Sequence, residues 1–227
     1  MIRLMLWVTS RCTLDCPFCS QGNTRRLHSD YEMSLEELKF IIDSSRSRGL
    51  RYETVEFTGG EPTLWTHLEE AAHLVFNSGI CNNLFLVTNG NNPERIRPLL
   101  PLLDYYCVSS SQANAQQVDA HKAFGHRIYW NEHKHKQIPT VGLIDVLPAE
   151  CCVRVNPDGT LVNTLMYLKG MVYYCCNAYH NSKIISGDSG LYCRFEEDFA
   201  LKFSNKNYDK QICRICLCNR KVWEVIK

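Results

Sequence analysis

The sequence contains no apolar run that approaches the roughly 20 residues needed for a membrane-spanning helix. Its opening stretch, MIRLMLWVTS, is too short and too soon interrupted to form a secretory signal. We therefore expect a cytoplasmic protein with no membrane partner.

An excess of charge of one sign is also absent, because 25 Lys and Arg residues nearly balance 24 Asp and Glu residues, for a formal net charge of +1. This balance disfavours broad electrostatic binding to nucleic acid, although the net charge does not exclude a local basic patch. Internal repeats and low-complexity tracts are missing too. The 227 residues suit one domain, or one and a half, with a sizeable core.

Cysteine, by contrast, is abundant, with 13 residues. Such a count is typical of disulfide-rich secreted scaffolds, but this chain is longer than those, lacks a signal and has an odd number of cysteines. In a reducing compartment, clustered cysteines more often bind metal. Cys81 and Cys107 lie in apolar surroundings, and we interpret them as core thiols.

Strand-like runs alternate with helical patterns through residue 150, which predicts βαβ units and a parallel sheet. This part of the chain is too short for a complete eight-stranded barrel. We therefore expect an α/β fold with a partial (β/α)5–6 barrel over residues 1–148. The predicted strands are 4–8, 54–58, 84–88, 105–109, 127–130 and 140–146.

The clearest helix signal is SLEELKFIIDSSRSRG, where Ser34 is the expected N-cap, Glu37 its capping-box partner and Gly49 the stop. A second helix is predicted over residues 64–78 and ends at Gly79. PERIRPLL, weakened by its prolines, and NAQQVDAHKAFG are further helical segments.

The pattern changes after about Pro148. From CCVRVNPDGTLV to GMVYYCCNAY the chain reads as extended segments with NPDG as a turn signal. A loop (SGDSG), a short helical stretch and the terminal CRICLC follow. We assign residues 149–227 to a second, small, cysteine-rich α+β region.

Two motifs that carry chemistry follow the first two predicted strands. Cys12, Cys16 and Cys19 have the spacing C-x3-C-x2-C, and Gly59 to Pro62 read GGEP. In parallel sheets, loops after the carboxyl ends of strands are where chemistry lies. Three thiolates can hold three irons of a [4Fe–4S] cube and leave the fourth iron open. The alternative is zinc, which usually pairs a short Cys motif with a second Cys or His pair.

Together the two motifs resemble the radical S-adenosylmethionine (radical SAM) superfamily. The resemblance implies that Cys12, Cys16 and Cys19 ligate a [4Fe–4S] cluster whose open iron is chelated by SAM. The reduced cluster then cleaves SAM to methionine and a 5′-deoxyadenosyl radical, which takes a hydrogen atom from the substrate. The cofactor carries this chemistry, and the protein binds and orients. A flavodoxin-type or ferredoxin-type electron donor is the implied partner.

The resemblance also implies contacts to SAM. Phe18 matches an aromatic residue beside the adenine, and Gly59, Gly60, Glu61 and Pro62 match the motif whose backbone bonds the methionine amino group. Glycines suit that position because they let the backbone approach a ligand closely. No catalytic acid or base is assigned. Further candidates for the SAM carboxylate and ribose follow later strands: Thr88, Asn89, Ser109, Ser111 and Asn131.

The C-terminal cysteines form a second group. Cys175, Cys193, Cys213 and Cys216 supply the four thiolates of a closed iron–sulfur cluster. This arrangement resembles the twitch domain, a shortened relative of the SPASM domain that holds one auxiliary [4Fe–4S] cluster. The layout, although not the substrate, is similar to that of the 2-deoxy-scyllo-inosamine dehydrogenase family. Cys176, Cys218, Cys151 and Cys152 compete as ligands, and a structural zinc or unligated core cysteines are the alternatives.

The sequence thus predicts a radical SAM enzyme that abstracts a hydrogen atom from a small molecule, nucleoside or peptide. An auxiliary cluster favours net oxidation or bond formation. One alternative is a single-cluster epimerase or isomerase with a structural zinc at the C-terminal cysteines. Another is a non-catalytic metal-binding scaffold.

Overall fold

A sheet of nine strands forms the centre of the residues that the computed structural model describes: 2–15, 30–109, 113–130, 154–155, 161–173 and 192–197. The strands are β1 (Ile2–Thr9), β2 (Tyr52–Gly59), β3 (Cys81–Thr88), β4 (Tyr105–Val108), β5 (Ile128–Trp130), β6 (Arg154–Val155), β7 (Leu161–Leu168), β8 (Met171–Tyr173) and β9 (Tyr192–Arg194). The α-helices are α2 (Leu35–Ser47), α3 (Leu68–Ser78) and α4 (Ala115–Ala123). Short 3-10 helices are η1 (Pro62–Leu64), η2 (Pro93–Arg95) and η3 (Arg97–Leu102).

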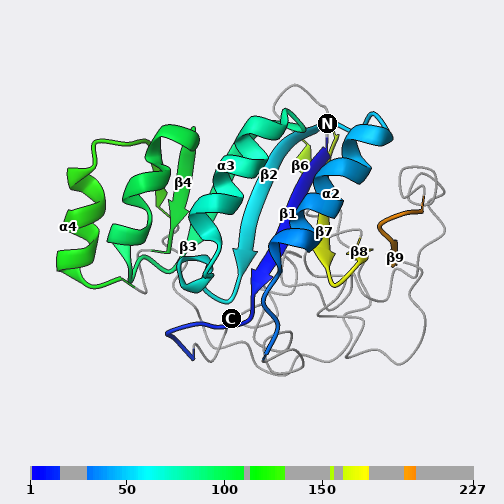
Figure 1. Ribbon diagram of the computed structural model, residues 1–227. Helices are drawn as coiled ribbons and strands as arrows, with labels where there is room; N and C mark the ends of the chain where they lie inside the picture. The colour runs from blue at the N-terminus through cyan, green and yellow to red at the C-terminus, as the bar shows by residue number, and fades with distance from the viewer. Residues whose placement is uncertain are drawn as a thin grey trace, which may run out of the picture.

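The first five strands pair in parallel and in chain order, from β1 to β5. Helical segments connect β1 to β2, β2 to β3, β3 to β4 and β4 to β5 (Figure 1). This order confirms the predicted α/β partial barrel and its first five strands. The predicted strand at 140–146 lies outside the described residues.

The chain then returns to the other side of β1. Strand β7 pairs in parallel with β1, so β1 lies between β2 and β7 in the interior of the sheet. A two-residue turn at Lys169 and Gly170 joins β7 to β8. Both residues have a positive φ (50° and 74°), which lets a two-residue hairpin turn follow the right-handed twist of its strands. Strand β9 pairs antiparallel with β8, and β6 pairs antiparallel with β7. The predicted boundary between residues 148 and 149 stays a prediction.

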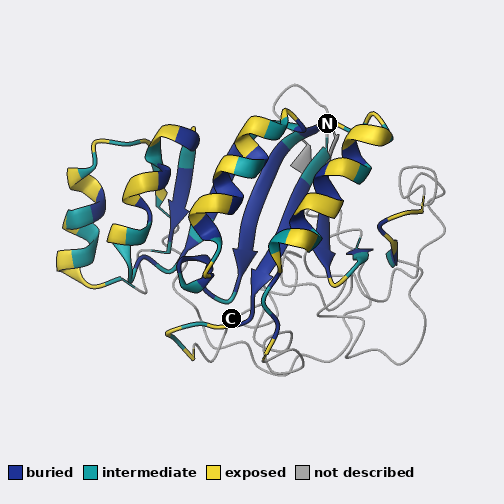
Figure 2. Cartoon of the chain, in the orientation of Figure 1, coloured by how far each residue is buried: buried dark blue, intermediate teal, exposed yellow. Residues whose placement is uncertain are grey.

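Two helices, α2 and α3, cover one face of the sheet and bury one stripe each (Figure 2). In both helices the buried positions follow the spacing i, i+3, i+4, i+7, which places them on a single side. On the sheet side, Phe57 of β2 packs edge-to-face against Trp65, with 5.6 Å between ring centroids. The buried residues are Leu38, Ile41, Ile42 and Ser45 in α2, and Leu68, Ala71, Ala72 and Val75 in α3.

The opposite face of the sheet carries an ion pair in which the carboxylate is buried and the guanidinium is partly exposed. The Arg3 guanidinium on β1 contacts the Glu56 carboxylate on β2 and lies 4.9 Å from the centroid of the Phe85 ring. Glu56 is buried and needs this partner, because an unpaired charge in the core is strongly destabilising. The pair and the ring therefore link β1, β2 and β3 across the sheet.

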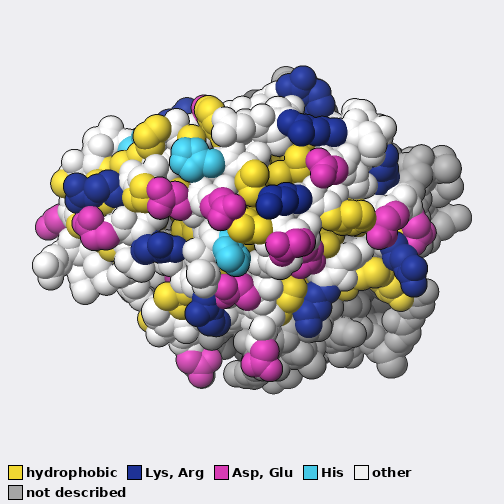
Figure 3. Space-filling view, in the orientation of Figure 1, with side chains coloured by type: hydrophobic (Ala, Val, Ile, Leu, Met, Phe, Trp, Pro, Cys, Tyr) yellow, Lys and Arg dark blue, Asp and Glu magenta, His cyan; other side chains and the backbone are white. Residues whose placement is uncertain are grey.

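Charged side chains of both signs are interspersed over the outer surface of the helices (Figure 3), in keeping with the near-neutral net charge. A groove of about 320 Å³ between α2 and α3 is lined by Lys39, Asp43, Arg46 and Glu70, among others. Within the part of the chain that the structure describes, no helix is long and apolar enough to cross a membrane.

Helix ends follow the sequence signals in part. The Ser34 hydroxyl accepts a hydrogen bond from the Glu37 backbone N–H (3.1 Å), and Gly49 has a φ of 65° after the last turn of α2, as predicted. The predicted 64–78 helix begins only at Leu68, because Pro62 to Leu64 form a separate 3-10 turn. PERIRPLL forms the 3-10 helices η2 and η3 rather than an α-helix, which fits its prolines. NAQQVDAHKAFG contains α4.

The predicted capping-box role of the Glu37 side chain is wrong. Its carboxylate accepts hydrogen bonds from the hydroxyls of Tyr31 (3.1 Å) and Tyr167 (2.8 Å) instead of turning back to Ser34. Burial, followed by the nearby Glu37 charge, raises the pKa of both tyrosines, so both hydroxyls keep the proton that they donate. Glu37 thereby connects α2 to β7.

We expect Glu37→Ala to lower the free energy of unfolding by about 1–3 kcal/mol, because it leaves two largely buried hydroxyls without their acceptor. Urea denaturation measures the change. Glu36→Ala is the matched control, since Glu36 lies in the same helical turn and is exposed. Equal losses in the two variants would contradict the connecting role of Glu37.

Candidate functional site

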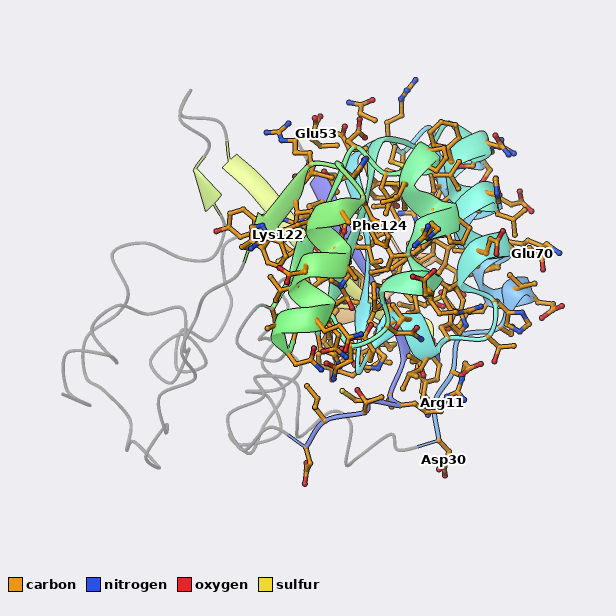
Figure 4. All side chains as sticks on the ribbon, turned by 90° about the vertical axis from the view of Figure 1, so that its left-hand side faces the viewer. Arg11, Asp30, Glu53, Glu70, Lys122 and Phe124 are labelled. Atoms are coloured by element: carbon orange, nitrogen blue, oxygen red, sulfur yellow. The ribbon has the colours of Figure 1, made fainter. Side chains whose placement is uncertain are left out.

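The carboxyl ends of the parallel strands meet at one edge of the sheet, and the segments after β1, β2 and β3 lie there together (Figure 1). In Figure 4, Arg11 and Asp30 mark this edge, and Glu53, at the start of β2, marks the opposite end. Ligand sites of open parallel sheets form outside the carboxyl ends of the strands. Cys12, the GGEP motif and Asn89 all belong to these segments.

The GGEP motif packs directly against the backbone that leads into Cys12. The Gly60 N–H donates to the Thr9 carbonyl, and the Glu61 N–H donates to the Arg11 carbonyl, each at 2.7 Å. A Cβ atom on Gly60 would lie 2.2 Å from the Arg11 carbonyl oxygen, and one on Gly59 would lie 2.4 Å from that of Thr9. The sequence suggested a ligand as the reason for these glycines. In the structure, the close approach is to another stretch of backbone.

Both ends of the loop that carries the cysteines are fixed by hydrogen bonds. The Ser10 N–H donates to the Tyr31 carbonyl (2.9 Å), where the chain returns from the loop. The Arg11 guanidinium contacts the Glu32 carboxylate and the Leu64 carbonyl, which follows the GGEP turn. The segment that positions Cys12 is therefore attached to both of its neighbours at the sheet edge.

Glu61 turns its side chain inward, where it is 1% exposed. Its Oε1 accepts hydrogen bonds from the backbone N–H (3.0 Å) and hydroxyl (2.8 Å) of Thr63 and from the Thr88 hydroxyl (2.8 Å), and its Oε2 accepts from the Asn89 N–H (2.7 Å). Burial raises the pKa of this carboxyl, and the donated hydrogen bonds oppose that shift. The carboxyl group thus joins the GGEP turn to the segment after β3.

The sulfur of Cys12 lies in a half-buried position and faces two N–H donors. The Leu14 backbone N–H lies 3.5 Å from Sγ, and the Asn89 side-chain Nδ2 lies 3.7 Å from it. The same Nδ2 donates to the Thr13 hydroxyl (3.1 Å). Two donors aimed at a sulfur suit a thiolate, the form in which cysteine binds iron, so this position fits a cluster ligand.

A buried histidine that we did not predict supports the segment after β3. His121 of α4 is fully buried, its Nε2 lies 3.1 Å from the Gly90 carbonyl, and its Nδ1 lies 3.0 Å from the Tyr106 hydroxyl. Because a carbonyl only accepts, Nε2 carries the proton and Nδ1 accepts from the tyrosine. Burial lowers the pKa of His121 and keeps it neutral. Its spacing of three residues from Val118 is the signal that could have placed it on the inner side of α4.

The sequence profile of the radical SAM superfamily matches residues 8–134, which is more than half of the chain. The chain belongs to the radical SAM superfamily. The matched residues contain all three cysteines of C-x3-C-x2-C, the GGEP motif and strands β2 to β5.

Curated relatives match a shorter part of the chain. A 7,8-dihydro-6-hydroxymethylpterin dimethyltransferase from Methanocaldococcus jannaschii is 34% identical over 95 residues, which cover 42% of this chain and 18% of that protein. A GTP 3′,8-cyclase from Actinobacillus pleuropneumoniae is 33% identical over 95 residues, or 41% of this chain and 27% of the cyclase. The match therefore spans less than a third of the length of either relative.

The solved structure of BtrN in complex with AdoMet and 2-DOIA resembles this chain over 95% of its residues and 92% of those of BtrN, with a TM-score of 0.62 and 18% identity. BtrN in an open conformation gives a TM-score of 0.59 at 17% identity. At these identities, the similarity shows the radical SAM fold and nothing finer.

The structure describes part of the site that the sequence predicts for this radical SAM protein. Cys12, Gly59 to Pro62, Thr88 and Asn89 come together, and Ser109 joins them through its N–H bond to the Thr88 carbonyl (3.0 Å). Cys193 is buried in β9, away from this group along the sheet. Eight predicted residues lie outside the described ranges: Cys16, Phe18, Cys19, Ser111, Asn131, Cys175, Cys213 and Cys216.

The two cysteines that we interpreted as core thiols fit that interpretation. Cys107 of β4 is buried among apolar residues. Cys81 of β3 is half-buried, and burial raises the pKa of its thiol to about 11. A thiol with so high a pKa stays protonated and is a poor metal ligand at neutral pH.

We expect Glu61→Gln to lower the free energy of unfolding by about 1–3 kcal/mol. The N–H groups of Thr63 and Asn89 donate to different oxygens, so either orientation of the new amide places its NH2 against a buried N–H. Thermal or urea unfolding measures the loss. Glu53→Gln is the matched control, because its partners are the side-chain amides of Asn82 and Asn83, which can rotate. A Glu61→Gln variant as stable as the control would show that the carboxyl group does not hold the two segments.

Proposed function

We propose that this protein cleaves SAM reductively at a [4Fe–4S] cluster held by Cys12, Cys16 and Cys19, and that it abstracts a hydrogen atom from a small molecule, nucleoside or peptide. The observation that carries the proposal is the contact of the GGEP turn with the segment leading into Cys12, through the Gly60 and Glu61 N–H groups. It joins the two motifs at the sheet edge where ligands bind. When bound, the cluster and SAM supply the electron transfer and the 5′-deoxyadenosyl radical.

The contacts of the described residues indicate how each contributes to this proposal. Glu61 uses its side chain internally, so its contribution to SAM binding comes from its backbone. The Thr88 hydroxyl donates to Glu61 and accepts from the Gly90 N–H (3.1 Å), which gives it a supporting role. Phe18, Ser109, Ser111 and Asn131 remain proposed contacts to SAM.

We further propose an auxiliary [4Fe–4S] cluster at Cys175, Cys193, Cys213 and Cys216, which favours net oxidation or bond formation as the outcome. Four cysteines are the usual ligand set of such a cluster. A flavodoxin-type or ferredoxin-type donor in the cytoplasm would supply the electrons.

Anaerobically reconstituted and reduced protein should convert SAM to 5′-deoxyadenosine, and Cys12→Ala should reduce the yield to that of a sample without protein. Chromatography with mass detection measures the product. The control is Cys81→Ala, which removes a half-buried thiol at the far end of β3 and should leave the yield unchanged. Wild-type protein that binds iron but forms no 5′-deoxyadenosine would overturn the proposed reaction.

The auxiliary cluster is tested in the variant that lacks Cys12, Cys16 and Cys19, each replaced by Ala. We expect about four irons per chain and the Mössbauer doublet of a [4Fe–4S]²⁺ cluster, because the C-terminal cysteines are untouched. Zinc, or no metal, would refute the auxiliary cluster and favour a single-cluster epimerase or isomerase with structural C-terminal cysteines.

A further inference from the structure

The orientation of the Asn89 side chain is determined by its neighbours. The Asn91 backbone N–H lies 2.9 Å from Oδ1 of Asn89, and a backbone N–H can only donate. The atom that faces Asn91 is therefore the carbonyl oxygen. The amide nitrogen points the other way, with one hydrogen for the Thr13 hydroxyl (3.1 Å) and one for the Cys12 sulfur (3.7 Å).

The backbone that carries this amide is held from two sides. The Asn89 N–H donates to the buried carboxyl of Glu61 (2.7 Å). One residue later, the Gly90 carbonyl accepts from the buried His121, and Gly90 has a φ of 80° in a space where a Cβ would lie 2.8 Å from Val108. Neither contact involves a ligand. The chain itself thus fixes the distance between the amide and the sulfur.

We propose that Asn89 is a positioning residue that donates an N–H···S hydrogen bond to the Cys12 thiolate and thereby raises the reduction potential of the cluster. This inference rests on the proposed function, since it takes Cys12 as a ligand. One electron from the external donor takes the cluster from [4Fe–4S]²⁺ to [4Fe–4S]⁺, and no bond forms or breaks. The added negative charge spreads onto the sulfurs, so a donor aimed at one of them stabilises the reduced form.

Asn89 is the side chain through which this effect can be tested. Among the described residues, the other N–H donor to the sulfur is the backbone of Leu14, which no side-chain substitution short of proline removes. Asn91 offers a matched control, because its amide donates to the Thr13 hydroxyl (3.3 Å) and not to the Cys12 sulfur. Asn91→Ala also keeps the N–H that orients Asn89.

The experiment is a redox titration of the reconstituted protein without SAM. It is followed by the electron paramagnetic resonance signal of the reduced cluster at Cys12, which is the signal that Cys12→Ala removes. Asn89→Ala should shift the midpoint to lower potential, with a three- to tenfold smaller equilibrium constant for reduction, where tenfold corresponds to about 59 mV for one electron. Asn91→Ala should have the same midpoint potential as the wild type. Equal midpoints in Asn89→Ala and the wild type would overturn the role of Asn89.

The wild-type cluster signal and the 5′-deoxyadenosine yield show whether the proposed function or only the role of Asn89 has failed. A wild-type protein that shows neither a [4Fe–4S] signal nor 5′-deoxyadenosine would refute the proposed function itself, whereas a functional cluster with unshifted midpoints would refute only the inference on Asn89.

If Asn89→Ala does not assemble a cluster, wild-type protein and Asn91→Ala are labelled with ¹⁵N in the asparagine side-chain amides. Electron–nuclear double resonance should then detect one coupled ¹⁵N in both proteins, and its absence would overturn the hydrogen bond.

Discussion

The contact between two stretches of backbone, Gly59 to Glu61 on one side and Thr9 to Arg11 on the other, is the constraint on which the site depends. Two hydrogen bonds of 2.7 Å hold them together, and neither glycine position has room for a Cβ atom. This contact sets the position of Cys12 relative to the second strand. The interactions of Arg11 and Glu61 then attach the same two segments to the returning loop and to the third strand.

The buried polar groups at this edge form a connected set in which each member has a partner. Glu61 receives four hydrogen bonds, Thr88 both donates and accepts, and His121 spans the Tyr106 hydroxyl and the Gly90 carbonyl. A fully satisfied network of this kind rigidifies the segments that it connects, whereas a half-satisfied one is costly. The side chains around Cys12 are therefore oriented by protein contacts alone, before any ligand binds.

Local signals in the sequence predicted much of this arrangement. Apolar periodicity located the first five strands, Ser34 and Gly49 located the ends of α2, and both chemical motifs fell at strand ends. The misses needed information on distant partners. The Glu37 carboxylate turns to Tyr167, some 130 positions away, and no local pattern predicts that choice. The pairing of β7 with β1 and the burial of His121 likewise depend on tertiary packing, which local propensity does not encode.

The position of β1 in the sheet has a consequence for biosynthesis. Its first residue pairs with Asn163, so the edge of β1 that faces β7 lacks that partner until synthesis has passed residue 163. An unpaired strand edge is a template for aggregation, and contacts between residues so far apart in sequence form slowly. During synthesis the nascent protein therefore carries β1 without its β7 partner, and this pairing forms only after β7 emerges.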